Sequence, residues 1–214
     1  PLRCVEGGPV GIVCADLFTT LDGVYQAPGG PDEDPAGGFP FGGWQGAYVD
    51  EESAEVILAG IRGMDALLLG RATYDIFAGY WPHQGENWIA AILNALPKYV
   101  VSSSMTGASW RGTTVLPDVD AVRSVRNRFH EVHVIGSGLL VRSLLGADLL
   151  DRLNLIVYPV TFGMGKRLLG DGVAVPASFR LTQPPRAFPS GAVHLVYDRV
   201  GVPVTGIDMG EIEV

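Results

Sequence analysis

Short apolar runs alternate with amphipathic stretches along most of this chain, which is the pattern of strands alternating with helices. Such alternation favours parallel pairing, because each helix carries the chain back to the same edge of the sheet. Two late runs follow each other without a helix between them and predict an antiparallel pair. We therefore predict an α/β fold with three layers, α/β/α, around a mixed, mostly parallel sheet. The predicted strands are 10–15, 66–69, 99–101, 113–116, 132–135, 153–160, 179–182 and 193–197; the predicted helices are 50–61, 71–78, 88–96, 118–128 and 139–145.

A long segment rich in glycine and proline, residues 26–46, interrupts this pattern after the first strand. Glycine and proline break both helix and strand patterns, so no regular element is expected there. Loops of this length inside a compact domain are usually functional. Because it follows the end of a strand, we interpret it as a lid or pocket rim; a surface insertion is the alternative.

The composition is that of a globular protein with a sizeable core. The chain has 214 residues, of which 47% are hydrophobic and 18% are charged. We find no internal repeat and no linker. The expected organisation is a single domain over residues 1–214, with a core at about 10–199 and an acidic tail at about 206–214.

Charge and residue usage narrow the functional classes. The net charge is −8, so a nucleic-acid partner is not expected, because nucleic-acid binders need a basic face. No apolar run is long enough to span a bilayer, and no signal peptide is recognised, so we expect a cytoplasmic protein. Cys4 and Cys14 are expected as free thiols, and no metal site is predicted because no two of the four histidines have the close spacing of a helical metal pair.

Groups suited to phosphate follow three of the predicted strands. Gly136-Ser137-Gly138 lies between a strand and a helix, where small residues and free backbone N–H groups let a phosphate approach. A tight turn without a ligand is the alternative, and the third glycine of a Rossmann fingerprint is replaced by Val141.

Two further strand ends carry donors. Gly70-Arg71-Ala72-Thr73-Tyr74 opens a helix and offers a guanidinium and a hydroxyl, and Ser102-Ser103-Ser104 follows the next strand. Taken singly, the first motif is a capped helix with a solvated arginine, and the second is a turn. Together they suit a dinucleotide with an extra 2′-phosphate, because ligands bind open α/β sheets at the carboxyl ends of the strands.

The ordered set of motifs resembles the NADPH-binding pattern of dihydrofolate reductases and, more closely, the RibD C-terminal family, the reductase domain of bacterial riboflavin biosynthesis. The resemblance runs from about residue 10 to residue 199. It rests on Leu21-Asp22-Gly23, on Met64 to Arg71 (MDALLLGR) with Thr73 and Tyr74, on Ser102-Ser103, on Ile135-Gly136-Ser137-Gly138, on Pro159-Val160-x-Phe162-Gly163-x-Gly165, and on Ser190-Gly191-Ala192-Val193.

By position, the resemblance assigns NADPH to the strand ends. It implies that Arg71 and Thr73, beside Gly70, hold phosphate and that Ser102 and Ser103 surround the 2′-phosphate. Residues Gly136, Ser137, Gly138 and Leu139 would take the pyrophosphate, and Leu21, Asp22 and Gly23 would lie near the nicotinamide.

The catalytic residues are less defined by the resemblance. Dihydrofolate reductases place a buried carboxylate soon after a Pro-Trp segment; here Asp50 and Glu51 are the candidates, with charges at the start of a helix as the alternative. The loop at Gly163-x-Gly165 departs from dihydrofolate reductase, so folate itself is not the expected substrate.

The sequence thus predicts an NADPH-dependent reductase that transfers hydride to a small pterin-like or pyrimidine-like heterocycle. A nucleotide-binding protein of the same fold without catalysis is the alternative, and a deazaflavin in place of NADPH is a third hypothesis. We also expect a homodimer, from the resemblance and from the apolar strand at 153–160.

Overall fold

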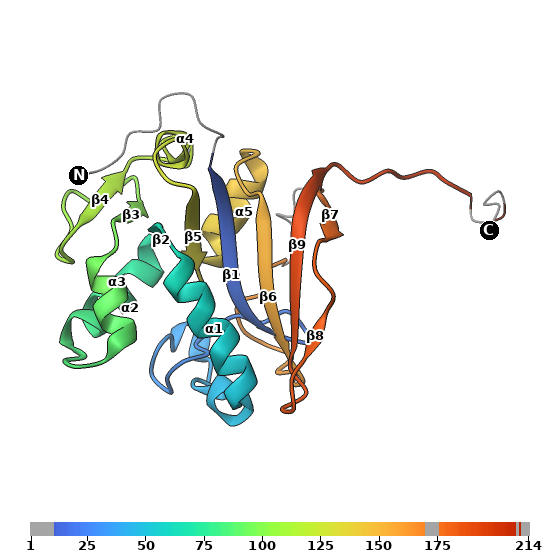
Figure 1. Cartoon of the computed structure of the whole chain (residues 1–214), viewed down its shortest axis with the longest axis horizontal. Helices are drawn as coiled ribbons and strands as arrows, with labels where there is room; N and C mark the ends of the chain where they lie inside the picture. Colours follow the sequence, from blue (N-terminus) through green and yellow to red (C-terminus); the bar gives the residue numbers. More distant parts are fainter. Residues whose placement is uncertain (1–10, 170–175, 209, 211–214) are drawn as a thin grey trace.

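The computed structural model describes residues 11–169, 176–208 and 210, and within them nine strands form one sheet (Figure 1). The strands follow the order β4-β3-β2-β5-β1-β6-β9-β7, with β8 paired to β9. The strands are β1 (Ile12–Thr20), β2 (Ala66–Gly70), β3 (Lys98–Val101), β4 (Thr113–Leu116), β5 (Glu131–Ile135), β6 (Arg152–Tyr158), β7 (Ser178–Leu181), β8 (Arg186–Ala187) and β9 (Val193–Gly201).

The sheet is mixed and mostly parallel, as predicted. Strands β1 to β6 pair in parallel with their neighbours, whereas β9 runs antiparallel to β6, β7 and β8. The predicted antiparallel pair near the end of the chain is therefore β7 and β9. The helices are α1 (Glu51–Gly63), α2 (Arg71–Tyr80), α3 (Trp88–Ala95), α4 (Val122–Arg126) and α5 (Gly138–Gly146), with short 3₁₀ turns at Ala36–Gly38, Trp44–Tyr48 and Trp81–His83.

Helices cover both faces of the sheet, which confirms the three-layer arrangement. On one face, Val13, Ala15 and Leu17 of β1 pack with residues of α4 and α5. On the other, Leu67 and Leu69 of β2 pack with residues of α1 and α3. Figure 1 shows α1 and α5 on opposite sides of β1. Alternate residues of a strand point to opposite faces, so each strand contributes to both layers.

Several elements differ from the prediction. Strand β1 continues to Thr20, past the polar Asp16, because that side chain has partners on the sheet. The helix expected at 118–128 shortens to α4, because Asp118 accepts a hydrogen bond from the Ala121 N–H in a turn that precedes it. Strand β8 was not predicted. Cys14 is buried and free, as expected, while Cys4 and residues 209 and 211–214 of the expected tail lie outside the described residues.

Strand β6 occupies a central position, hydrogen-bonded to β1 on one edge and to β9 on the other. Because both edges of β6 are paired, the strand offers no free edge to a second subunit. Its apolar sequence is explained by burial inside the sheet. The homodimer stays a prediction that rests on the family resemblance. No helix in the described part of the chain has the length and apolar character needed to cross a membrane.

Lys98, at the start of β3, is the largest charged side chain in the interior and is 1% exposed. Its ammonium donates to the carbonyl oxygens of Leu93, Asn94 and Leu96 at 2.9, 3.0 and 2.7 Å. It also lies 4.7 Å from the centre of the Trp110 ring. The last carbonyls of a helix have no partners of their own, so Lys98 joins the end of α3 to the sheet.

We expect Lys98→Met to lower the free energy of unfolding by about 2–4 kcal/mol, because it leaves buried carbonyl groups without a donor. Urea denaturation would measure the change. Arg111→Met, at an exposed position, is the control and is expected to leave the stability nearly unchanged. A Lys98→Met protein as stable as the control variant would contradict this role.

Candidate functional site

A cleft of about 1350 Å³ lies on the α1 side of the sheet. Its floor is formed by β1, β5, β6 and β9, and α1 supplies an apolar wall through Val56, Ile57 and Gly60. Of the segment 26–46 that we predicted as a lid or pocket rim, residues 26–34 and Gln45 line the cleft. At one end the cleft reaches Thr73, Gly136 and Ser137, at the carboxyl ends of β2 and β5.

The structure brings together the predicted groups at the ends of β2 and β5. The Gly70 N–H donates to the Ser137 hydroxyl at 3.0 Å, and that hydroxyl donates to the Ile135 carbonyl at 3.3 Å. A Cβ built on Gly136 would lie 3.6 Å from the Thr73 methyl. The two turns therefore form one surface, because β2 and β5 are parallel neighbours.

The turn before α5 has an open geometry suited to an anion. Gly136 and Ser137 have φ of 60° and 52°, and Ser137 precedes the helix without a side-chain cap in the described structure. The first N–H groups of a helix need such a partner. The next residue but one, Leu139, is 68% exposed although it is apolar. These features fit a bound pyrophosphate.

Gly138 has a packing role that the sequence analysis did not identify. It lies within α5 and outside the left-handed region, and a Cβ on it would overlap the ring of Tyr25. Packing against Tyr25, a residue that lines the cleft, requires glycine at this position. The assignment of Gly138 to the pyrophosphate stays a prediction.

Arg71, Ser102 and Ser103 lie beside the cleft and not in its lining. Val101 pairs with Gly70, so Ser102 and Arg71 follow adjacent strand ends. The Arg71 Nε is bonded to the Asp75 carboxylate at 2.7 Å, in a half-exposed pair one helical turn long. Exposed pairs of this kind contribute little to stability, so Arg71 can exchange Asp75 for a ligand at small cost.

The segment Leu21–Gly23 forms the turn that follows β1. Leu21 is 66% exposed, and Gly23 has a φ of 76°. Asp22 accepts hydrogen bonds from the Thr20 hydroxyl at 2.5 Å and from the Gly163 N–H at 2.8 Å. Burial raises the pKa of Asp22, but these hydrogen bonds outweigh it and lower the pKa below its usual value. The carboxylate thus holds this turn against the loop at Gly163.

Asp50 and Glu51 are not placed to donate a proton in the cleft. Asp50 caps α1: it accepts from the Ser53 N–H at 2.8 Å, and its other oxygen accepts from the Ser190 N–H at 2.8 Å. The Ser53 bond, followed by the Ser190 bond, lowers the pKa of Asp50 to about 2. Glu51 is exposed in the first turn of α1. The alternative of helix-terminal charges is the one that the geometry supports.

The rim at 26–46 is held by internal polar contacts. The buried Gln26 amide donates to the carbonyls of Asp34 and Ala36, and its oxygen accepts from the Lys166 N–H at 2.9 Å. The Trp44 indole donates to the Gln26 carbonyl at 2.8 Å. A segment without regular structure therefore has a defined shape, because side chains satisfy its backbone groups.

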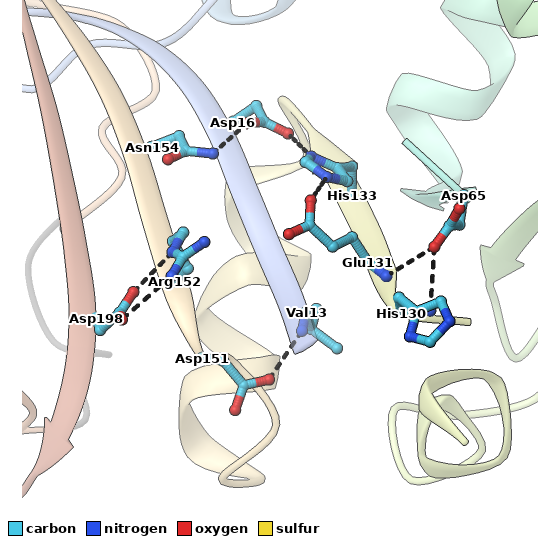
Figure 2. A network of polar contacts seen from close by, with 10 residues as sticks. All are labelled: Val13, Asp16, Asp65, His130, Glu131, His133, Asp151, Arg152, Asn154 and Asp198. Atoms are coloured by element: carbon cyan, nitrogen blue, oxygen red, sulfur yellow. Dashed lines mark hydrogen bonds and ion pairs between the residues drawn. The ribbon is translucent and has the colours of Figure 1, made fainter. Parts of the chain in front are cut away.

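The floor of the cleft carries a polar network that the sequence analysis did not identify (Figure 2). Asp16 lies at its centre, with the Asn154 amide 2.8 Å from one carboxylate oxygen and His133 Nδ1 2.6 Å from the other. His133 Nε2 lies 3.2 Å from Glu131, and Arg152 is paired with Asp198 at 2.7 Å.

His133 is the buried member of this network. Burial by itself lowers the pKa of His133, but the hydrogen bonds and charges of Asp16 and then Glu131 outweigh it and raise the pKa above its ordinary value. The sequence carried a signal for the network: Asp16, His133 and Asn154 are polar residues at alternating positions in otherwise apolar strands.

We expect Gly138→Ala to destabilise the protein by about 1–3 kcal/mol, because its methyl group overlaps the Tyr25 ring. Adding Tyr25→Ala should recover part of this loss, and the coupling can be measured with a double-mutant cycle of thermal melts without ligand. Additive effects of the two changes would show that Tyr25 is not the obstacle.

The cap at Asp50 predicts a pH dependence. The folded pKa of about 2 lies below the ordinary 3.8, so the charge stabilises the fold above pH 3.8 and this contribution is lost as the pH falls to about 2. Asp50→Asn should melt below the wild type near neutral pH, and the gap should close in strong acid. Glu55→Gln, on the exposed side of α1, is the control. A gap that is independent of pH would contradict the assignment.

Comparisons with known proteins agree with this geometry. The RibD C-terminal domain family matches residues 12–183. A protein named for riboflavin biosynthesis from Shewanella sp. PV-4 is similar in structure, with a TM-score of 0.61 and 20% identity, over 88% of this chain and 99% of that one. A pyrimidine reductase-like protein from Corynebacterium diphtheriae has a TM-score of 0.57 and 16% identity, over 89% and 92%.

The fold is also that of dihydrofolate reductase. The enzyme from Enterococcus faecalis, in a complex with NADP(H) and RAB-propyl, has a TM-score of 0.56 and 16% identity, over 89% of this chain and 97% of that one. A search of curated proteins found no significant match. Because the family match covers most of the sequence, this chain belongs to the RibD C-terminal domain family, a reductase family with the dihydrofolate reductase-like fold.

Proposed function

We propose that this protein is an NADPH-dependent reductase of a small heterocyclic compound. The observation that carries the proposal is the continuity of the cleft: it runs from the phosphate-suited turn at Gly136 and Ser137 to a polar floor around Asp16 and His133. A dinucleotide at the strand ends and a small ring on the floor would then share one cavity, which hydride transfer requires.

The residues at the strand ends fit the cofactor. Gly136 and Ser137 would leave the first N–H groups of α5 free for the pyrophosphate. Thr73 would add a hydroxyl, and Arg71 with Ser102 and Ser103 would surround the 2′-phosphate. The exposed Leu21 and Leu139 would be covered by apolar parts of the cofactor. When bound, NADPH supplies the hydride, and the protein supplies orientation and a site shielded from water.

The cleft favours a small, flat substrate. Val56 and Ile57 of α1 face the polar floor across it, so one side of a ring would meet apolar groups and its edge would meet hydrogen-bonding groups. Binding sites for heterocycles combine such walls with few polar groups. A nucleotide-binding protein without catalysis, the alternative from the sequence, would have no use for the network on the floor.

We expect NADPH to bind at least about tenfold more tightly than NADH, because a charge-assisted contact to the 2′-phosphate is worth about 1.5–3 kcal/mol. Isothermal titration calorimetry with both nucleotides would measure the preference. Arg71→Ala should reduce it, whereas Arg111→Ala, at an exposed position distant in sequence, should not.

Equal affinities for the two nucleotides would contradict recognition of a 2′-phosphate by Arg71 and the serines. The hypothesis of a deazaflavin would then gain support, because that cofactor has no 2′-phosphate to recognise.

A further inference from the structure

Three adjacent strands direct polar side chains toward the cleft near the turn at Gly136. In the register of the sheet, Asp16 of β1 pairs with Asn154 of β6 and with Ile135 of β5, the residue directly before that turn. The Gly136 N–H itself donates to the Asp16 carbonyl at 3.3 Å. Asp16 therefore stands beside the place where the strand-end turn and the floor of the cleft meet.

Asp16 is the carboxylate of the network that can reach a ligand beside the turn at Gly136. Its side chain is 21% exposed and lines the cleft, whereas the side chain of His133 is 5% exposed and has a carboxylate at each ring nitrogen. Glu131 also lines the cleft and is 40% exposed, but it lies at the start of β5, at the end of the strand away from that turn. A carboxylate can accept up to about four hydrogen bonds. Asn154 and His133 supply two, so Asp16 keeps capacity for a bound molecule.

His133 and Glu131 fix the orientation of Asp16. The imidazole is held at Nδ1 by Asp16 and at Nε2 by Glu131, which leaves it no nitrogen for a ligand. Asn154 holds the second oxygen of Asp16 from the opposite strand. The carboxylate of Asp16 is thus held in place by side chains from both neighbouring strands. Because its orientation is fixed before a ligand binds, its hydrogen bond to that ligand costs less conformational entropy.

The charges around Asp16 do not favour an anion. Two carboxylates, Asp16 and Glu131, face one imidazole, so the centre of the floor keeps an excess of negative charge. The other cations that line the cleft have carboxylate partners: Arg152 is paired with Asp198, and Arg186 is paired with Glu52. Burial lowers the pKa of His194 on β9, which favours its neutral form. The rim adds Asp32, Glu33 and Asp34, of which Asp34 is paired with Lys166.

We propose that Asp16 is the group that binds the substrate ring, that His133 and Glu131 are positioning residues, and that the cleft selects a neutral or cationic ring with N–H donors over an anionic or phosphorylated one. This inference rests on the proposed function, because it assumes that the cleft holds the heterocycle. The ring edge would donate to Asp16, and its face would lie toward α1.

The wall opposite Asp16 has space for such a ring. Gly60, in the interior of α1, lines the cleft, and a Cβ built on it would meet no other atom within 4 Å. Glycine inside a helix is less stable than alanine, so the open space at the wall comes with a weaker helix. A side chain added at this position therefore starts in open space at the wall of the cleft.

The test uses two pyrimidines of similar size as probes. One is a diaminopyrimidine whose two amino groups flank a ring nitrogen, and the other is orotate, an anion. Calorimetry should show that the wild type prefers the diaminopyrimidine and that Asp16→Asn, which keeps the shape but loses the charge, weakens it by at least about tenfold. Equal binding of the two probes to the wild type, or unchanged binding of the diaminopyrimidine to Asp16→Asn, would overturn the proposal.

Gly60→Phe provides a second variant that does not alter the polar network. It should abolish binding of the diaminopyrimidine, while Glu55→Phe, on the exposed side of the same helix, should not. Unchanged binding to Gly60→Phe would place the probe outside the cleft and overturn the proposal.

The positioning role of His133 can be tested separately from substrate binding by Asp16. Nitrogen-15 NMR of the imidazole should show a lower pKa of His133 in Asp16→Asn than in the wild type, because the nearest carboxylate has been neutralised. His133→Gln should weaken the diaminopyrimidine while the melting temperature and NADPH affinity stay close to those of the wild type. Loss of NADPH affinity together with the melting temperature would indicate a purely structural role and overturn the positioning assignment.

NADPH titrations distinguish failure of the substrate assignment from failure of the proposed function. If the wild type and Asp16→Asn bind NADPH equally but neither protein discriminates between the two pyrimidines, the substrate assignment fails and the proposed cofactor function stands. If the wild type binds no NADPH, the proposed function fails whatever the pyrimidines do.

Discussion

The register of β1 between β5 and β6 is the constraint on which the rest of the site depends. Val13, Ala15 and Leu17 pack in the core beneath α5, and the carboxylate of Asp16, between two of them, lies in the network on the floor of the cleft. A slip of one residue would turn Asp16 to the other face and bury it among aliphatic side chains. The apolar half of the strand therefore selects the register, and the register in turn brings Asp16, His133 and Asn154 together.

Polar side chains that fasten loops have a second role in shaping the site. Asp22 joins the turn after β1 to Gly163, and Gln26 joins the rim to Lys166. These contacts link segments about 140 residues apart in the sequence, which is why the rim has a defined course without helix or strand. The carboxylate of Asp22 is thereby used for structure, although its motif resembles one that lies near a nicotinamide.

The carboxylates show which roles a local sequence pattern can predict and which it cannot. Asp50 precedes an amphipathic stretch, and that local signal was sufficient to predict the cap that the structure shows. Asp16 differs: its place inside an apolar strand marks it as unusual but does not identify its partners, because these are His133 and Asn154 on other strands. Gly138 is a similar case, since the ring that requires glycine there belongs to Tyr25.

The sequence by itself determined the order of strands and helices, the mixed sheet and the three strand ends with phosphate-suited groups, because periodicity, caps and glycine turns act over a few residues. It also indicated the rim at 26–46 through glycine and proline. Only the tertiary structure decided that Asp16 faces the cleft and that His133 is held between Asp16 and Glu131. These outcomes depend on the pairing of distant strands and on charges that meet only after folding, and no local pattern encodes such distances.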